Sequence, residues 1–306
     1  MTFAEGKELY LAQKQKHIKI STLAAYERMW VSHIDKALGE KLLTELDRKT
    51  ILEYVETLKN KGLSNKTIQS HVMFIKSVLN GLTNEHDIDV PNTHWALLLE
   101  KKATPKKLSR LTDAEAKKLI EFCTNEPSNR NLALLMAVTT GMRIGEICAL
   151  QFSDIDFDKG EIKIDKTLER VAFSGQPSQI YIGSAKSESS CRIVPMLPKV
   201  SKLAKNFSKV AKPNWYVATG AAKYTEPRTL RNYFDKVCKK IGIPKIVFHG
   251  LRHTFASMMI TKGVDVKTVS SILGHAGVEI TMDVYCNPTS EEQHNATKKV
   301  FDKLFK

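Results

Sequence analysis

The sequence lacks the features that define several classes of protein. Its five cysteines are scattered, odd in number and never spaced as C-x-x-C, which argues against a disulfide framework and a zinc site. No apolar run approaches the ~20 residues that a membrane-spanning helix needs, and no signal peptide opens the chain. A Walker loop and clustered carboxylates are missing as well. These absences predict a cytoplasmic protein and give no sign of a nucleotide cofactor or a metal.

Acidic residues are scarce relative to basic ones. The 306 residues include 47 Lys and Arg against 33 Asp and Glu, a net charge of +14 with a pI near 9.4. Such an excess indicates a polyanionic partner, most often nucleic acid, although a basic enzyme with a solvated surface would have the same charge. The length allows two domains with a core each, and the hydrophobic content of 42% is ordinary for a globular protein.

Hydrophobic periodicity predicts a helical bundle in the first part of the chain, residues 1–103. Asp47 and Ser64 can cap two of its helices, and the apolar residues that follow recur at spacings of three and four. The stretch 101–110 is basic, contains one proline and no acid, and is predicted to be a linker.

The second predicted domain, 108–306, is mainly α-helical with a small antiparallel β-sheet. A capping box at Thr112 and Glu115 begins its first helix. The apolar run 131–140 predicts a central helix that Gly141 ends. Three short antiparallel strands are expected at 161–164, 179–182 and 191–195, and the basic stretch 199–245 is predicted to be helical.

Several side chains of this second part suit the binding of a phosphate. Arg143 is predicted to begin a helix, with Glu146 three residues on to orient its guanidinium. His249 and Arg252 share a face at the start of another helix, where helix N-termini attract anions. Taken singly, each has a structural explanation, such as a surface ion pair or a capping histidine.

Two more residues complete this set. His275 ends a Leu-Gly-His segment, and Tyr285 follows ten residues later. Guanidinium and imidazole groups can hold a phosphate that a phenol attacks. The structural alternatives are a helix C-terminal cap for His275 and a half-buried core aromatic for Tyr285.

Together these motifs resemble those of the tyrosine recombinases, the phage integrase family. The resemblance covers 111–306 and rests on TGMRIGEICAL around Arg143, HGLRHTFAS around His249 and Arg252, LGH ending at His275, and Tyr285. It extends more loosely to 1–100, where KNKGLSNKTI is similar to the helical core-binding domain of the family. The implied fold is a helical core-binding domain followed by a tyrosine-recombinase catalytic domain.

The resemblance implies a role for each side chain. Tyr285 would be the nucleophile, and Lys186 the general acid that protonates the leaving 5′ oxygen. The family often has Thr-Lys-Thr there, whereas this chain has Ala185-Lys186-Ser187, so Lys163 and Lys166 stay open as substitutes. The other implied roles are binding of the scissile phosphate by Arg143, Arg252 and His275, proton transfer assisted by His249, and support of the arginines by Glu146.

The resemblance also implies partners. It predicts a site-specific recombinase that integrates and excises a phage or conjugative element, monomeric in solution and tetrameric on two double-stranded DNA sites. A C-terminal helix, 289–306, would dock onto a neighbouring protomer. Accessory DNA-bending or directionality factors, a nucleoid-associated place in a bacterial cytoplasm, and the need for no cofactor follow from the same resemblance.

Other interpretations stay open. Many integrases have an arm-binding domain before the core-binding helices, whereas this sequence starts almost at those helices, so that domain is either absent or truncated. A Xer-like chromosome-dimer resolvase without such a domain is therefore an alternative. A type IB topoisomerase uses the same tyrosine chemistry without strand exchange. A DNA-binding protein built on an inactive recombinase is a further alternative, which the intact set of site residues disfavours.

Overall fold

The computed structural model describes residues 1–93, 109–184 and 191–285, together with residue 298. The chain divides into two compact units, Met1–Lys106 with Arg170–Ile180, and Lys107–Glu169 with Tyr181–Lys306. This division groups Arg170–Ile180 with the first unit, and the predicted domains 1–103 and 108–306 stay a prediction. Among the described residues, no helix combines the length and hydrophobicity that a bilayer span requires.

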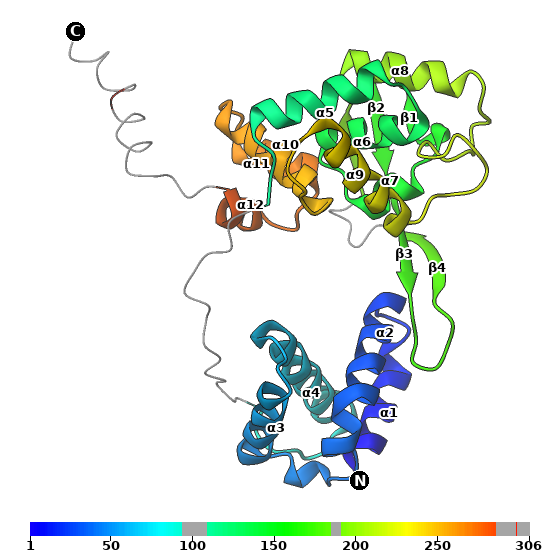
Figure 1. Ribbon diagram of the computed structural model, residues 1–306. Helices are drawn as coiled ribbons and strands as arrows, with labels where there is room; N and C mark the ends of the chain where they lie inside the picture. Colours follow the sequence, from blue (N-terminus) through cyan, green and yellow to red (C-terminus); the bar gives the residue numbers. More distant parts are fainter. Residues whose placement is uncertain (94–108, 185–190, 286–297, 299–306) are drawn as a thin grey trace. The chain divides into compact units, whose positions relative to one another are not determined.

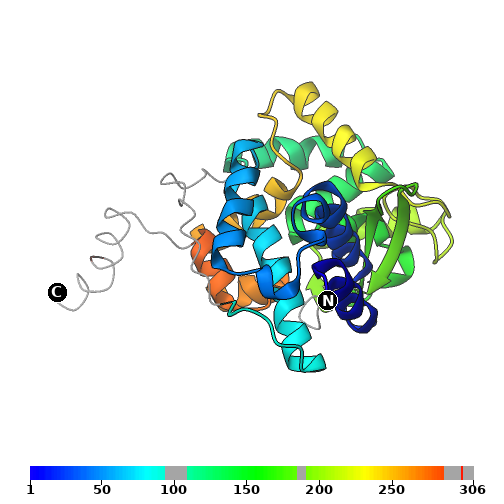
Figure 2. The ribbon, with the colours of Figure 1, turned by 90° about the horizontal axis from the view of Figure 1, so that it is seen from below.

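The first unit is a helical bundle, drawn from blue to cyan in Figures 1 and 2. As predicted, Asp47 and Ser64 cap helices, because their side chains accept hydrogen bonds from the main-chain N–H groups of Thr50 and Thr67. The elements are α1 (Phe3–Lys14), α2 (Ile20–Met29), η1 (Trp30–Gly39), η2 (Leu43–Glu45), α3 (Arg48–Asn60) and α4 (Asn65–His86).

One apolar core holds this bundle together. On α4, Ile68, Ile75 and Leu79 are fully buried, one above another at helical spacing. The ring of Phe3 on α1 lies 5.3 Å from that of Trp30 on η1, centroid to centroid. Each such side chain stabilises the fold by about 1.5–3 kcal/mol relative to its exposed state.

The second unit is built around α6 (Asn129–Thr140), which packs against helices on several sides (Figure 1). Its residues from Leu132 to Ala137 are all buried, which confirms the prediction of a central helix. The remaining helices are α5 (Asp113–Asn125), α7 (Ile144–Ala149), η3 (Phe152–Asp154), α8 (Pro198–Ser208), α9 (Pro227–Ile241), α10 (His249–Thr261), α11 (Val266–Leu273) and α12 (Val278–Tyr285).

The β structure differs in part from the prediction. A three-stranded antiparallel sheet has the order β1 (Ile155–Asp156), β2 (Glu161–Ile164), β5 (Arg192–Pro195). The expected strand at 179–182 is β4 (Gln179–Ser184), but it pairs in a separate two-stranded sheet with β3 (Lys166–Val171). β3 was missed because charged residues interrupt its apolar alternation. The mainly α-helical fold with small sheets is confirmed.

The prediction of helix throughout 199–245 is wrong. Between α8 and α9 the chain forms turns, in which Tyr216 makes β-bridges with Gln151 and Ala221. Pro213 and Gly220 lie in this segment, and both residue types disfavour helix.

Gly141 lies where the end of α6 packs closely against α10 and α11, two helices that follow the sheet in the chain. It ends α6 with a φ of 67°, and a Cβ there would lie 2.7 Å from side-chain atoms of Leu273 and of Phe255. Gly242 ends α9 with the same φ of 67°, but a Cβ there would meet nothing within 4 Å. The two glycines therefore share a backbone conformation and differ in packing.

We expect Gly141→Ala to destabilise the second unit more than Gly242→Ala. Left-handed backbone costs a non-glycine residue about 1–2 kcal/mol at either position, and overpacking at position 141 adds about 1–3 kcal/mol. Thermal unfolding of both variants, compared with the wild-type protein, measures the difference. Equal losses of stability would show that α6 and α11 do not depend on the close approach at Gly141.

Candidate active site

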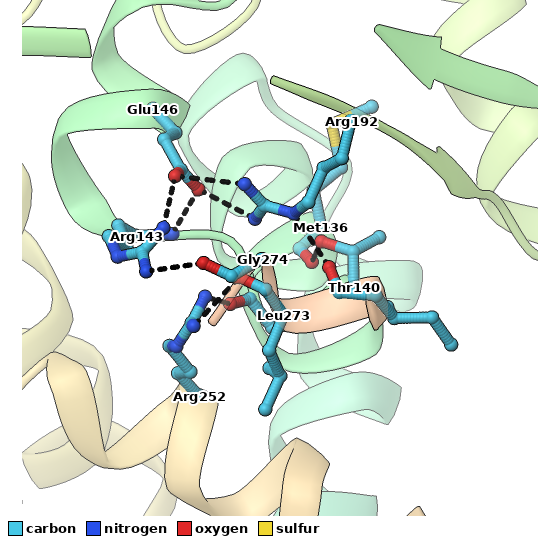
Figure 3. Close-up of polar contacts among 10 residues, drawn as sticks. Met136, Thr140, Arg143, Glu146, Arg192, Arg252, Leu273 and Gly274 are labelled. Atoms are coloured by element: carbon cyan, nitrogen blue, oxygen red, sulfur yellow. Dashed lines mark hydrogen bonds and ion pairs between the residues drawn. The ribbon is translucent and has the colours of Figure 1, made fainter. Parts of the chain in front are cut away.

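Three arginines from separate elements converge on the C-terminal end of α11 (Figure 3). The last carbonyls of a helix have no partner within the helix, and that end carries partial negative charge. Three consecutive carbonyls there accept hydrogen bonds from guanidinium groups. These bonds are Arg192 Nε to Ile272 O at 2.6 Å, Arg252 Nη2 to Leu273 O at 2.8 Å, and Arg143 Nη2 to Gly274 O at 3.1 Å.

Glu146 links two of these arginines, Arg143 and Arg192 (Figure 3). Its carboxylate, only 3% exposed, accepts hydrogen bonds from Arg143 Nη1 at 2.8 Å and from Arg192 Nη1 and Nη2 at 3.1 and 2.9 Å. Burial alone would raise the pKa of Glu146, but the hydrogen bonds and charge of Arg192, together with Arg143, lower it below its usual value. The group is therefore a carboxylate at neutral pH.

Local sequence explains where Arg143 lies. Gly141 ends α6, and Arg143 is the N-cap of α7, where its extended backbone differs from the helix that follows. Glu146 is the third residue of that helix and also accepts from the main-chain N–H of Arg143 at 2.8 Å. The predicted contact between Arg143 and Glu146 is thus present. The Arg143 side chain is 36% exposed, so solvent or a ligand can reach it.

Arg252 is buried instead, with 2% of its surface exposed. Its Nη1 donates to Gly141 O at 3.0 Å, and its Nη2 donates to Leu273 O. The guanidinium therefore lies between the C-terminal ends of α6 and α11, where two helix dipoles favour a cation. This contact explains how a charge with so little exposure is tolerated.

The two predicted histidines lie near these cations. His249 is exposed at the start of α10, with its ring edge-on to that of His253 at 4.7 Å between centroids. The protein packed around His249 and the charges of His253, Arg252 and Arg143 lower its pKa to about 4. His275 Nδ1 is 2.8 Å from Thr281 Oγ1 of α12. Its pKa is also lowered to about 4, first by desolvation and then by the arginines. Both rings are neutral at pH 7.

Two of the predicted site residues fall wholly or partly outside the described part of the chain. Lys186 lies outside the described residues, as do positions 289–297 and 299–306 of the predicted docking helix. Tyr285 is the last residue of α12, and its side chain lies outside the described part. The two substitutes for Lys186 form ion pairs, Lys163 with Asp165 at 2.9 Å and Lys166 with Asp154 at 3.0 Å.

Sequence reasoning missed Arg192. Its side chain is 6% exposed and contacts both Glu146 and the end of α11. A signal was present, because side chains alternate along a strand and Arg192 shares its side of β5 with the buried Val194. An arginine at an inward position of a half-buried strand needs a partner in the interior.

Comparison with known proteins agrees with this geometry. The model of the phage integrase family matches residues 109–292, and that of the phage integrase N-terminal SAM-like domain matches 2–59. A XerC-like tyrosine recombinase of Caldanaerobacter subterraneus subsp. tengcongensis is 26% identical over 93% of this chain and 78% of its own. The ICEBs1 integrase of Bacillus subtilis is 24% identical over 89% of this chain and 75% of its own.

A solved structure shares the fold. The integrase of transposon Tn1549, in complex with a circular intermediate DNA, superposes with a TM-score of 0.76 at 22% identity, covering 96% of this chain and 99% of that one. The fold is that of the tyrosine recombinases, enzymes that cleave and rejoin DNA strands. This chain belongs to the phage integrase family, which confirms the predicted resemblance.

The histidine pKa values predict how stability depends on pH. The folded-state pKa of His275, about 4, lies below the usual value of 6.5 for a histidine, so the unfolded chain binds more protons between these values. Stability from this group is fully present above pH 6.5 and is lost as the pH falls towards 4. We expect His275→Asn, which can still bond Thr281, to flatten the fall in melting temperature over this window. Parallel curves for the variant and the wild type would contradict this expectation.

Proposed function

We propose that this protein is a site-specific DNA recombinase of a mobile element, and that it cleaves DNA through a 3′-phosphotyrosyl intermediate on Tyr285. The observation that carries the proposal is the meeting of Arg143, Arg252 and His275 at the end of α11, beside the helix that ends with Tyr285. In the sequence these residues are far apart, between positions 143 and 285, and the fold brings their elements together.

The link from this cluster to α12 supports Tyr285 as the nucleophile. Thr281 is fully buried on α12 and contacts His275. Position 285 follows position 281 by four residues within one helix, and positions at this spacing lie on one helical face. Position 285 thus belongs to the same face of α12 as Thr281, which contacts the histidine.

The chemistry needs cations more than a strong base. A free tyrosine has a pKa near 10, and Arg143 and Arg252 favour the phenolate and offset charge that grows on the phosphoryl oxygens. The phenolate oxygen of Tyr285 attacks phosphorus, the bond to the 5′ oxygen breaks, and Lys186 donates a proton to that oxygen. Attack by a 5′ hydroxyl of the second DNA reverses these steps and frees the phenol.

Neutral histidines suit a site that binds an anion. His249 would accept the phenol proton, and His275 would donate a hydrogen bond to the phosphate. A bound phosphodiester adds negative charge beside both rings and would raise their pKa values from about 4, since an opposite charge favours imidazolium. Substrate binding would therefore make His249 a better base.

The same proposal includes the partners. The helical domain 1–103 and the catalytic domain 108–306 would bind double-stranded DNA together, and four protomers would act on two sites. Two observations support DNA as the partner: residues 2–59 match the N-terminal SAM-like domain of phage integrases, and the net charge of the chain is +14. Accessory DNA-bending or directionality factors and a cytoplasmic, nucleoid-associated location in a bacterial host stay predictions.

Resolution of chromosome dimers is the second candidate. The XerC-like relative and the ICEBs1 integrase have nearly equal identity to this chain, 26% and 24%, so identity does not separate the two roles. The DNA that flanks the gene would separate them. Repeats that match an attachment site on both sides of a mobile segment would support the integrase role, and a lone gene without such repeats would support the resolvase.

Tyr285→Phe should abolish covalent attachment to DNA. Phenylalanine keeps the ring and removes the oxygen that forms the phosphotyrosyl bond. A suicide substrate with a nick beside the cleavage site traps the intermediate, which a denaturing gel detects as a shifted band. The wild type should form this band, and a variant that also forms it would show that another residue is the nucleophile.

Arg143→Ala should lose cleavage while keeping most of its affinity for DNA. Removal of one donor to the phosphoryl oxygens costs about 10²–10³ in rate, whereas binding is spread over many phosphates. Wild-type affinity should itself fall by about 10³–10⁵ between 50 and 200 mM salt if 6–10 phosphates are contacted. An equal loss of binding and cleavage would make Arg143 a general DNA anchor instead.

A further inference from the structure

We propose that Arg192 is a positioning residue for strand cleavage, which sets the orientation of the Arg143 guanidinium through Glu146 and holds the end of α11 that presents His275. This inference rests on the proposed function. Arg192 would act without contacting DNA, through its hydrogen bonds to Glu146 and Ile272 O.

The geometry shows one guanidinium used in two directions (Figure 3). Its Nη1 and Nη2 donate to the two carboxylate oxygens of Glu146 at 3.1 and 2.9 Å, a bidentate pair. Its Nε donates to Ile272 O at 2.6 Å, on the α11 side. A planar group with five N–H donors can satisfy both partners at once, whereas a lysine ammonium is a single point charge.

Glu146 passes the effect to the catalytic side. Its carboxylate binds Arg192 and the guanidinium of Arg143 together, so neither pair can shift alone. With 6% exposure for Arg192 and 3% for Glu146, water cannot replace a lost partner readily. The Arg143 side chain is exposed enough for a phosphate to reach it, and its orientation is set from the buried side.

The α11 contact acts on His275. Ile272 O, Leu273 O and Gly274 O follow one another, and each accepts from one arginine. His275 is the next residue after Gly274, and its ring then contacts Thr281 of α12. Arg192 thus holds the first of three carbonyls directly before the histidine, while its charge also lowers the pKa of His275.

Arg192→Gln is the first test. We expect single-turnover cleavage of the suicide substrate to fall by about 10²-fold at pH 7.5, the cost of a misplacement of about 1 Å. DNA affinity should change little. An equal loss of affinity and cleavage, or a wild-type rate, would overturn the inference.

The pH profile separates positioning from a merely structural role. Glu146 faces Arg143 at the start of α7, Arg192 of β5 and, farther off, His249 of α10. Without Arg192, burial dominates and raises the pKa of Glu146, so the carboxylate becomes protonated and releases Arg143 as the pH falls. As the pH is lowered, the cleavage rate of Arg192→Gln should therefore begin to fall at a higher pH than the rate of the wild type.

Two further variants identify the origin of that decline. The double variant Glu146→Gln with Arg192→Gln has no carboxyl group at position 146 to titrate. The added decline of its cleavage rate at acid pH should therefore vanish. Its persistence would assign the decline to His275 and overturn the role of Glu146. Arg192→Lys keeps the charge but cannot make both contacts, so its loss of rate should be smaller than the loss of about 10²-fold expected of Arg192→Gln, without the added decline.

Controls keep the outcomes distinct. The control variant is Lys159→Gln. Lys159 forms an exposed ion pair with Asp156 of β1, 3.7 Å away, in the sheet that also contains β5. Loss of this exposed cation should leave cleavage unchanged. If Arg192→Gln does not fold, Arg192→Lys decides the matter, and a wild-type rate there overturns the inference. Tyr285→Phe is run alongside, because covalent attachment by that variant would mean that the proposed function fails, whatever the Arg192 variants show.

Discussion

The catalytic unit depends on the unfilled hydrogen-bonding capacity at the end of one helix. The last carbonyls of α11 accept no hydrogen bond within the helix, and three guanidiniums donate hydrogen bonds to them. Because consecutive carbonyls lie close together, three arginines distant in sequence are brought into one small region. A helix end that would otherwise need water thus becomes the frame on which a cationic site is assembled.

Charge balance explains why this cluster is stable before DNA binds. Three guanidiniums near one another repel, but the carbonyl dipoles and the buried Glu146 offset part of that repulsion. The histidines reduce it further by staying neutral, with pKa values of about 4. What remains is an excess of positive charge beside α12, in the region that the proposed mechanism fills with a phosphodiester anion.

Predictability from the sequence differed between local and distant features. The caps at Asp47, Ser64 and Thr112 were predictable because each bonds an N–H group three residues away. The pairing of Arg143 with Glu146 is equally local. Arg192 escaped notice because its partners lie 46 and 80 residues away and one of them is a main-chain atom. The separate β3–β4 sheet escaped because charged residues hide the alternation of β3.

By itself, the sequence determined the family, the helical character of both parts and the residue types available for phosphate chemistry, because motifs and periodicity are written in neighbouring side chains. Only the tertiary structure decided that Arg252 is buried between two helix ends, that Arg143 keeps an exposed edge, and that Arg192 contacts both Glu146 and the end of α11. The physical reason is that main-chain carbonyls are the same in every residue. Which of them lack a partner, and which cation fills the gap, depends on where helices end in space.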